Sequence, residues 1–195
     1  MYLSGMADNV VVELPAVPPA QLAAAVRAML GEGGEMAPLP SAARLAADAA
    51  AAVADGGDAE GARRFQALIE LGYLAASADG LDPAERDALA TLIERLTGDA
   101  VDHATLERHL ADLDAAAAML GRHERLARVA ADLGDGDRRD EALGFAALVA
   151  MADGRLCDTE LAVLDELGGC FGLATAEVRA IVDRVADAVA RAVLR

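Results

Sequence analysis

The chain has 195 residues, a formal charge of −16 and an apolar share of 55%, with 3% aromatic residues and no Trp. It is long enough to bury a core, which must be built from Leu, Val, Ile and Ala. The acidic composition repels nucleic-acid phosphates and makes a cation or a basic protein surface the better partner. No segment reaches the roughly 18 uninterrupted apolar residues of a membrane span, so an integral membrane protein is not expected.

The amino-terminal sequence and the two cysteines predict a cytoplasmic location. Residues 1–14 lack the basic start and long apolar run of a signal peptide. Cys157 and Cys170 are too far apart for a Cys-x-x-Cys pair, and two thiols do not make a disulfide framework. Cys170 follows an apolar stretch and precedes Phe171, which predicts a place in the core.

The first 57 residues are predicted to form an amino-terminal extension with Ala-rich helices. Residues 9–14 read as an extended lead-in, because no second strand is evident to pair with them. Pro19 lies at the tolerated first position of a helix that continues to residue 30. Ser41 is the expected N-cap of a second helix ending near residue 55. This helix has few bulky apolar side chains and is expected to pack lightly.

From residue 58 onward the pattern predicts an all-α domain of about seven helices. Apolar residues recur at helical spacing, and Gly, Asp and Pro lie between the periodic segments. The expected elements cover residues 62–78, 83–98, 103–120, 123–133 and 175–193, with a second helical hairpin over 139–171. The alanines of 115–118 are assigned to the core, and Arg122, Arg125 and Arg128 to a solvent-facing side.

A helix-turn-helix pattern occurs twice, over about residues 65–98 and 139–173. Each copy has an apolar run ending in Ala-Asp-Gly, then a Leu, then a glutamate that opens a second helical run. When Asp79 is aligned with Asp153, the second copy carries one extra residue after the turn, and Glu85 then meets Glu160. This repeated pattern indicates a duplicated hairpin with internal pseudo-symmetry.

The turns have a purely structural interpretation. Gly80 and Gly154 lie where a helix ends with a residue of positive φ. The segment from Asp82 to Glu85 has the form of a capping box with proline at the first helical position. In the second copy Cys157 replaces that aspartate, and the neighbouring Asp158 is an alternative cap.

Capping does not explain Asp79 and Asp153. A carboxylate in the last turn of a helix faces the negative end of the helix dipole, a cost of about 0.3–1 kcal/mol at an exposed site. Carboxylates gathered from two such turns would form an all-oxygen site suited to Ca²⁺, Mg²⁺ or Mn²⁺. The spacing does not match an EF-hand, whose 12-residue loop carries acids at alternating positions.

The duplicated Ala-Asp-Gly turns in an acidic all-helical chain resemble the tellurite-resistance protein TerB and the wider TerB-like superfamily, over roughly residues 62–190. The resemblance implies a compact pseudo-symmetric helical fold, a cytoplasmic role in bacterial metal or tellurite stress, and acidic residues proposed to bind divalent metal. By motif position those residues are Asp79, Glu85, Asp153 and Glu160. The chain departs from the usual pattern in the unequal lengths of its turns and in Cys157 at the second cap.

No nucleophile, base and orienting acid can be assembled from the sequence, so an enzyme is not expected. Two functions remain open: a metal-binding stress protein that works through a protein partner, and a metal-free interaction module whose Ala-rich amino-terminal helices dock a partner. Two smaller candidates also have two interpretations each. His103 and Glu107 form either a weak chelating pair or a salt-linked helix face. Cys157 is either a reactive thiol at a helix start or a half-buried cap.

Overall fold

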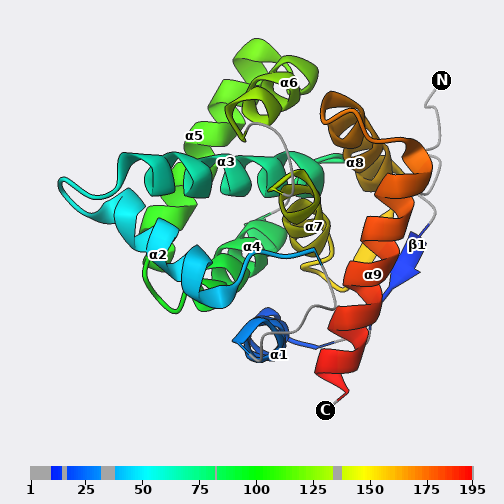
Figure 1. Ribbon diagram of the computed structural model, residues 1–195, viewed down its shortest axis with the longest axis horizontal. Helices are drawn as coiled ribbons and strands as arrows, with labels where there is room; N and C mark the ends of the chain where they lie inside the picture. Colours follow the sequence, from blue (N-terminus) through cyan, green and yellow to red (C-terminus); the bar gives the residue numbers. More distant parts are fainter. Residues whose placement is uncertain (1–9, 15–16, 32–37, 82, 134–137, 195) are drawn as a thin grey trace.

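The computed structural model describes residues 10–14, 17–31, 38–81, 83–133 and 138–194. Within these ranges the chain forms nine helices and two short strands (Figure 1). The helices are α1 (Pro19–Gly31), α2 (Ala42–Val53), α3 (Ala59–Ala76), α4 (Pro83–Leu96), α5 (His103–Leu120), α6 (Arg122–Leu133), α7 (Arg138–Ala150), α8 (Asp158–Cys170) and α9 (Thr175–Val193), and the strands are β1 (Val10–Glu13) and β2 (Arg155–Cys157). The predicted all-α class is confirmed.

The two predicted hairpins are α3–α4 and α7–α8, and their first helices pack against each other at the centre of the molecule. The close approach depends on Gly72, because a Cβ at this position would lie 2.8 Å from a methyl carbon of Val149. Every residue from 142 to 152 is buried. This all-round burial explains why α7 shows no clear polar face in the sequence, as expected for a helix enclosed on all sides.

The amino-terminal helices contribute to the same hydrophobic core as the hairpins. Leu22 and Val26 of α1 are buried where that helix packs against α4 and α9. The expectation of light packing was wrong for α2, which lies closely along α3 and buries Leu45 and Ala49. Small alanine side chains bring helix axes close together, so few bulky residues suffice.

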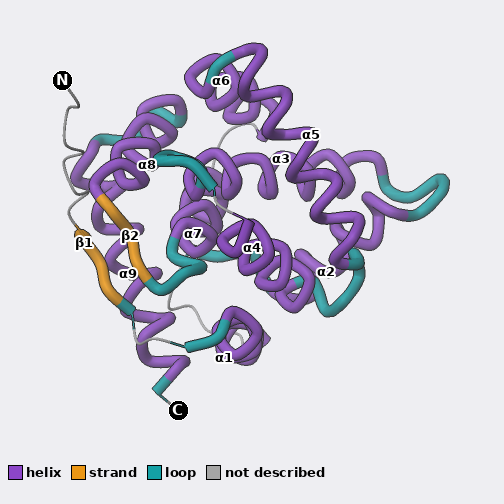
Figure 2. Tube along the Cα trace, turned by 180° about the vertical axis from the view of Figure 1, so that it is seen from behind, coloured by secondary structure: helices purple, strands orange, loops and turns teal. Residues whose placement is uncertain are grey.

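The segment expected to be an unpaired lead-in is a strand. β1 pairs antiparallel with β2, with Val10 opposite Cys157 and Glu13 opposite Arg155, and the pairing is irregular between Val10 and Val12. Figure 2 shows the two strands side by side at the edge of the helical body. The expectation was wrong because β2 begins at the extra residue of the second turn. With three residues, it is too short to show a strand pattern in the sequence.

The end of α5 is more exposed than predicted. Its buried stripe contains Leu106, Leu110 and Leu113. Of the alanines of 115–118, Ala117 is half-buried and packs against the core, whereas the core assignment was wrong for the other three. Met119 and Leu120 are 83% and 43% exposed.

The solvent-facing assignment of the α6 arginines was wrong for two of the three. Arg125 forms a largely buried ion pair with Glu70 of α3, which also explains the acid that interrupts the apolar run of that helix. The Arg122 guanidinium is half-buried and donates to backbone carbonyls of the first acidic turn. Arg128 is exposed as expected.

In the described part of the chain, no helix combines the length and apolar character needed to cross a membrane.

Candidate functional site

The first acidic turn follows α3. The Ser77 N–H donates to the Tyr73 carbonyl at 2.9 Å and closes the helix. Gly80 follows with φ 109°, a conformation that favours glycine. The Arg122 guanidinium donates to the carbonyls of Ser77 and Ala78 at 2.8 and 3.0 Å. These bonds satisfy carbonyls at the helix end and hold the turn that carries Asp79.

The second acidic turn follows α7 and continues into β2. Gly154 has φ 90°, and its carbonyl accepts a 2.8 Å hydrogen bond from the Leu14 N–H of the amino-terminal segment. The Asp153 carboxylate accepts from the Arg155 N–H at 2.8 Å and pairs with its guanidinium at 3.3 Å. The extra residue of this turn therefore places a cation beside the predicted site.

Helix α8 begins with Cys157 as its N-cap, and the Cys157 N–H donates to the Glu160 carboxylate at 2.8 Å. Glu160 thus fills the glutamate role of a capping box. The thiol is half-buried, and burial raises the pKa of Cys157, which disfavours the reactive thiolate. The cap interpretation is supported.

The core assignment of Cys170 was wrong, since this residue is exposed.

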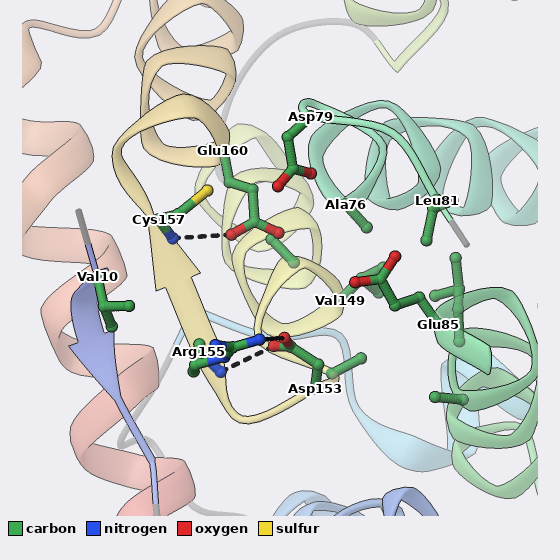
Figure 3. Close-up of a pocket in the computed structure, with 14 residues that line it drawn as sticks. Val10, Ala76, Asp79, Leu81, Glu85, Val149, Asp153, Arg155, Cys157 and Glu160 are labelled. Atoms are coloured by element: carbon green, nitrogen blue, oxygen red, sulfur yellow. Dashed lines mark hydrogen bonds and ion pairs between the residues drawn. The ribbon is translucent and has the colours of Figure 1, made fainter. Parts of the chain in front are cut away.

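All four predicted site residues line a single cavity of about 140 Å³, which we call the acidic cavity (Figure 3). Asp79 and Glu85 come from the first hairpin, and Asp153 and Glu160 from the second. Apolar side chains on the two hairpins and β1 form the rest of the wall, together with Cys157 and Arg155. The apolar lining residues are Val10, Ala76, Leu81, Ala88, Leu89, Val149, Ala150 and Ala152. Asp82 lies outside the described residues.

The cavity concentrates negative charge. The pKa of Glu160 is raised to about 7, chiefly by burial; the charges of Asp153 and Asp79 also act to raise it, and the hydrogen bonds with Cys157 act to lower it. Among the described lining residues, Arg155 carries the single positive charge. The arrangement suits an added cation, which would compete with a proton for the Glu160 carboxylate.

The four carboxylates share the cavity without forming a ready coordination shell. Within the described chain, three ligand atoms lying within 4.8 Å of one another occur at Asp87, His103 and Glu107, outside the acidic cavity. A cation in the cavity would therefore draw the carboxylates inward. All four acids lie on turns or on the first turn of a helix.

The fold and cavity define a class: an all-helical protein with a duplicated hairpin whose two acidic turns open into one cavity. The family of the tellurite resistance protein TerB matches residues 65–183, from α3 into α9, and the chain belongs to this family. The predicted resemblance is confirmed, and the chain contains a tellurite-resistance-associated helical domain. No curated protein and no solved structure matches the chain.

The four acids were predicted from the sequence, but the roles of two arginines were not. Arg155 is the extra residue of the second turn, so the unequal turn lengths were its signal. Arg122 carries no comparable signal, because its role depends on where α6 packs relative to the end of α3. Val10 was missed with the strand that carries it.

Proposed function

We propose that this TerB-family domain is a non-enzymatic, cytoplasmic protein that binds one divalent cation, Ca²⁺, Mg²⁺ or Mn²⁺, in the acidic cavity during metal or tellurite stress. The observation that supports the proposal is the gathering of Asp79, Glu85, Asp153 and Glu160 around one cavity, from two turns 74 positions apart at their aspartates. Carboxylate oxygens are the ligands that these hard cations prefer.

Charge and surroundings both favour a cation. The chain carries a formal charge of −16, so the field around it draws cations inward. The apolar lining lowers the local dielectric and strengthens the attraction between the carboxylates and a bound ion. Waters would complete a shell of six or more oxygens.

Isothermal titration of the chelator-stripped chain with Ca²⁺, Mg²⁺ and Mn²⁺ tests the proposal. We expect saturable binding of one equivalent and a melting temperature that rises with cation concentration. The double variant Asp79→Asn/Asp153→Asn should abolish the binding and keep the helical circular dichroism. Asp55→Asn/Asp132→Asn removes the same charge from exposed positions that do not line the cavity and should bind normally.

Two results would contradict the proposal. One is a titration that never saturates in the wild-type chain. The other is equal loss of binding in the two double variants. That result would show that the binding heat comes from the general surface charge rather than from the acidic cavity.

A second candidate function is docking of a protein partner at the end of α5, where Met119 and Leu120 are exposed. Exposed apolar side chains that lie together favour a protein contact. Deleting residues 1–57 tests docking poorly, because Leu22, Val26 and Leu45 of that segment belong to the core. The sharper test compares cross-linked partners of the wild-type chain with those of Met119→Ser/Leu120→Ser. Identical partners would reject docking at this surface.

A further inference from the structure

A second group of metal-ligating side chains lies where α5 begins, away from the acidic cavity. The Nε2 atom of His103 is 3.2 Å from Oδ1 of Asp87 and 3.8 Å from Oε1 of Glu107. The three ligand atoms all lie within 4.8 Å of one another. Asp87 belongs to α4, and the other two residues occupy successive turns of α5. We call this group the α4–α5 cluster.

The loop that connects α4 and α5 fixes the position of the two helices relative to each other. Thr97 is buried after α4, and its hydroxyl donates to the Glu94 carbonyl at 2.9 Å. Val101 is buried in the connecting loop. The Asp102 carboxylate caps α5 by accepting from the Thr105 N–H at 3.0 Å. The loop is anchored at both ends, so the backbones that carry the three ligands are fixed relative to each other.

We propose that the α4–α5 cluster binds a divalent transition metal, with Zn²⁺ as the probe that reports it. One imidazole nitrogen and two carboxylate oxygens form a three-ligand set, and water can take the fourth tetrahedral position. The imidazole distinguishes this set from the all-oxygen cavity, since nitrogen ligands favour Zn²⁺, Co²⁺ and Ni²⁺ over Ca²⁺ and Mg²⁺.

The ligands are accessible to an incoming ion. The side chains of His103, Glu107 and Asp87 are 32%, 47% and 67% exposed. A competing explanation is a protonated His103 that pairs with both acids without metal. The two explanations differ in a measurable way, because an ion pair alone gives no saturable response of the imidazole nitrogen to zinc.

The test is a Zn²⁺ titration of the full chain, followed by heat and by the nitrogen-15 resonances of the histidine rings. It uses a Cys170→Ser background, because that exposed thiol also attracts zinc. We expect one saturable equivalent and a shift at Nε2 of His103. His103→Gln should weaken zinc binding about tenfold or more. His123→Gln, at an exposed histidine outside the cluster, should leave it unchanged.

Asp87→Asn provides a second variant that does not touch α5, and it should also weaken zinc binding. The cluster and the acidic cavity share no residue, so Asp79→Asn/Asp153→Asn should keep zinc binding at the cluster. Rejecting one of the two metal-binding proposals therefore does not reject the other. The inference is overturned by an unmoved His103 ring at saturating zinc. It is equally overturned by wild-type zinc affinity in His103→Gln and Asp87→Asn.

Discussion

Arg155 shows how one inserted residue changes a site. Its guanidinium pairs with Asp153, and its side chain lines the acidic cavity while remaining 61% exposed. The pair is an exposed one, of the kind that contributes about 0.2–1 kcal/mol. A cation entering the acidic cavity must compete with this charge.

We therefore predict that Arg155→Ala strengthens cation binding in the acidic cavity, by about two- to fivefold on the scale of an exposed ion pair. Isothermal titration with Mn²⁺ measures the change. Arg179→Ala, which breaks the surface pair with Asp165 on α9 and α8, is the matched control and should bind as the wild type does. Weaker binding in Arg155→Ala would show that the guanidinium organises the turn rather than competing with the ion.

Tyr73 is the second residue with a distinctive environment. Its hydroxyl hydrogen-bonds to Asp114, which also pairs with Arg86. Burial raises the pKa of Tyr73 to about 12, and the hydrogen bond and charge of Asp114 act in the same direction. The folded state thus favours the neutral phenol, so the stabilisation is complete below the ordinary pKa of 10 and is lost as the pH rises towards 12.

An ultraviolet absorbance titration checks this shift. In a Tyr2→Phe background, which leaves Tyr73 as the single tyrosine, tyrosinate should appear with a midpoint near 12. Asp114→Asn should lower that midpoint, because it removes the negative charge beside the hydroxyl. A midpoint near 10 in the folded chain would contradict the buried hydrogen bond.

At the scale of elements, the contact between α3 and α7 sets the position of both hairpins. A Cβ at Gly72 would lie 2.8–3.0 Å from three side-chain carbons of Val149. The branched side chain of a fully buried residue has no space to withdraw. The two helices must therefore separate or repack if the glycine gains a side chain.

We predict that Gly72→Ala destabilises the fold by about 1–3 kcal/mol, the usual cost of overpacking. Denaturant unfolding measures it. Gly169→Ala in α8 is the matched control, since its added Cβ would meet no atom within 4 Å beyond its chain neighbours and the adjacent backbone of its own helix, and it should be neutral or slightly stabilising. Adding Val149→Ala to Gly72→Ala should restore part of the loss. Equal effects at the two glycines would show that helix propensity, not packing, decides.

The helices could be predicted from sequence because each signal is local. Asp102 and Ser41 cap the helices they were expected to cap, with their side chains accepting from Thr105 and Arg44 N–H groups. The grouping of the four acids around one cavity could be predicted because the duplication repeats them. The pairing of β1 with β2 could not, since it joins distant segments and β2 has three residues. The inward placement of Arg125 on α6 depends on its ion pair with Glu70 on α3, which the local spacing of residues does not reveal.

At the scale of the whole molecule, the division at residue 57 remains a prediction, and the core gives it a direct test. Residues 58–195 alone would lack Leu22, Val26 and Leu45, which are buried in the full chain. Burial of each such side chain contributes about 1.5–3 kcal/mol. We expect the fragment to melt at a lower temperature than the full chain and to bind a dye for exposed apolar surface. An unchanged melting temperature would establish that residues 1–57 are dispensable for folding.

The enclosure of α7 gives the molecule an internal reporter. The backbone N–H groups of its buried residues 142–150 meet solvent only when the surrounding helices come apart, so their hydrogen exchange should follow global unfolding. The exposed end of α5 should exchange through local fraying instead. Cation binding that stabilises the whole fold should slow exchange by the same factor in every amide of residues 142–150 and leave the α5 end unchanged. Slowing confined to the turns at Asp79 and Asp153 would instead show local ordering.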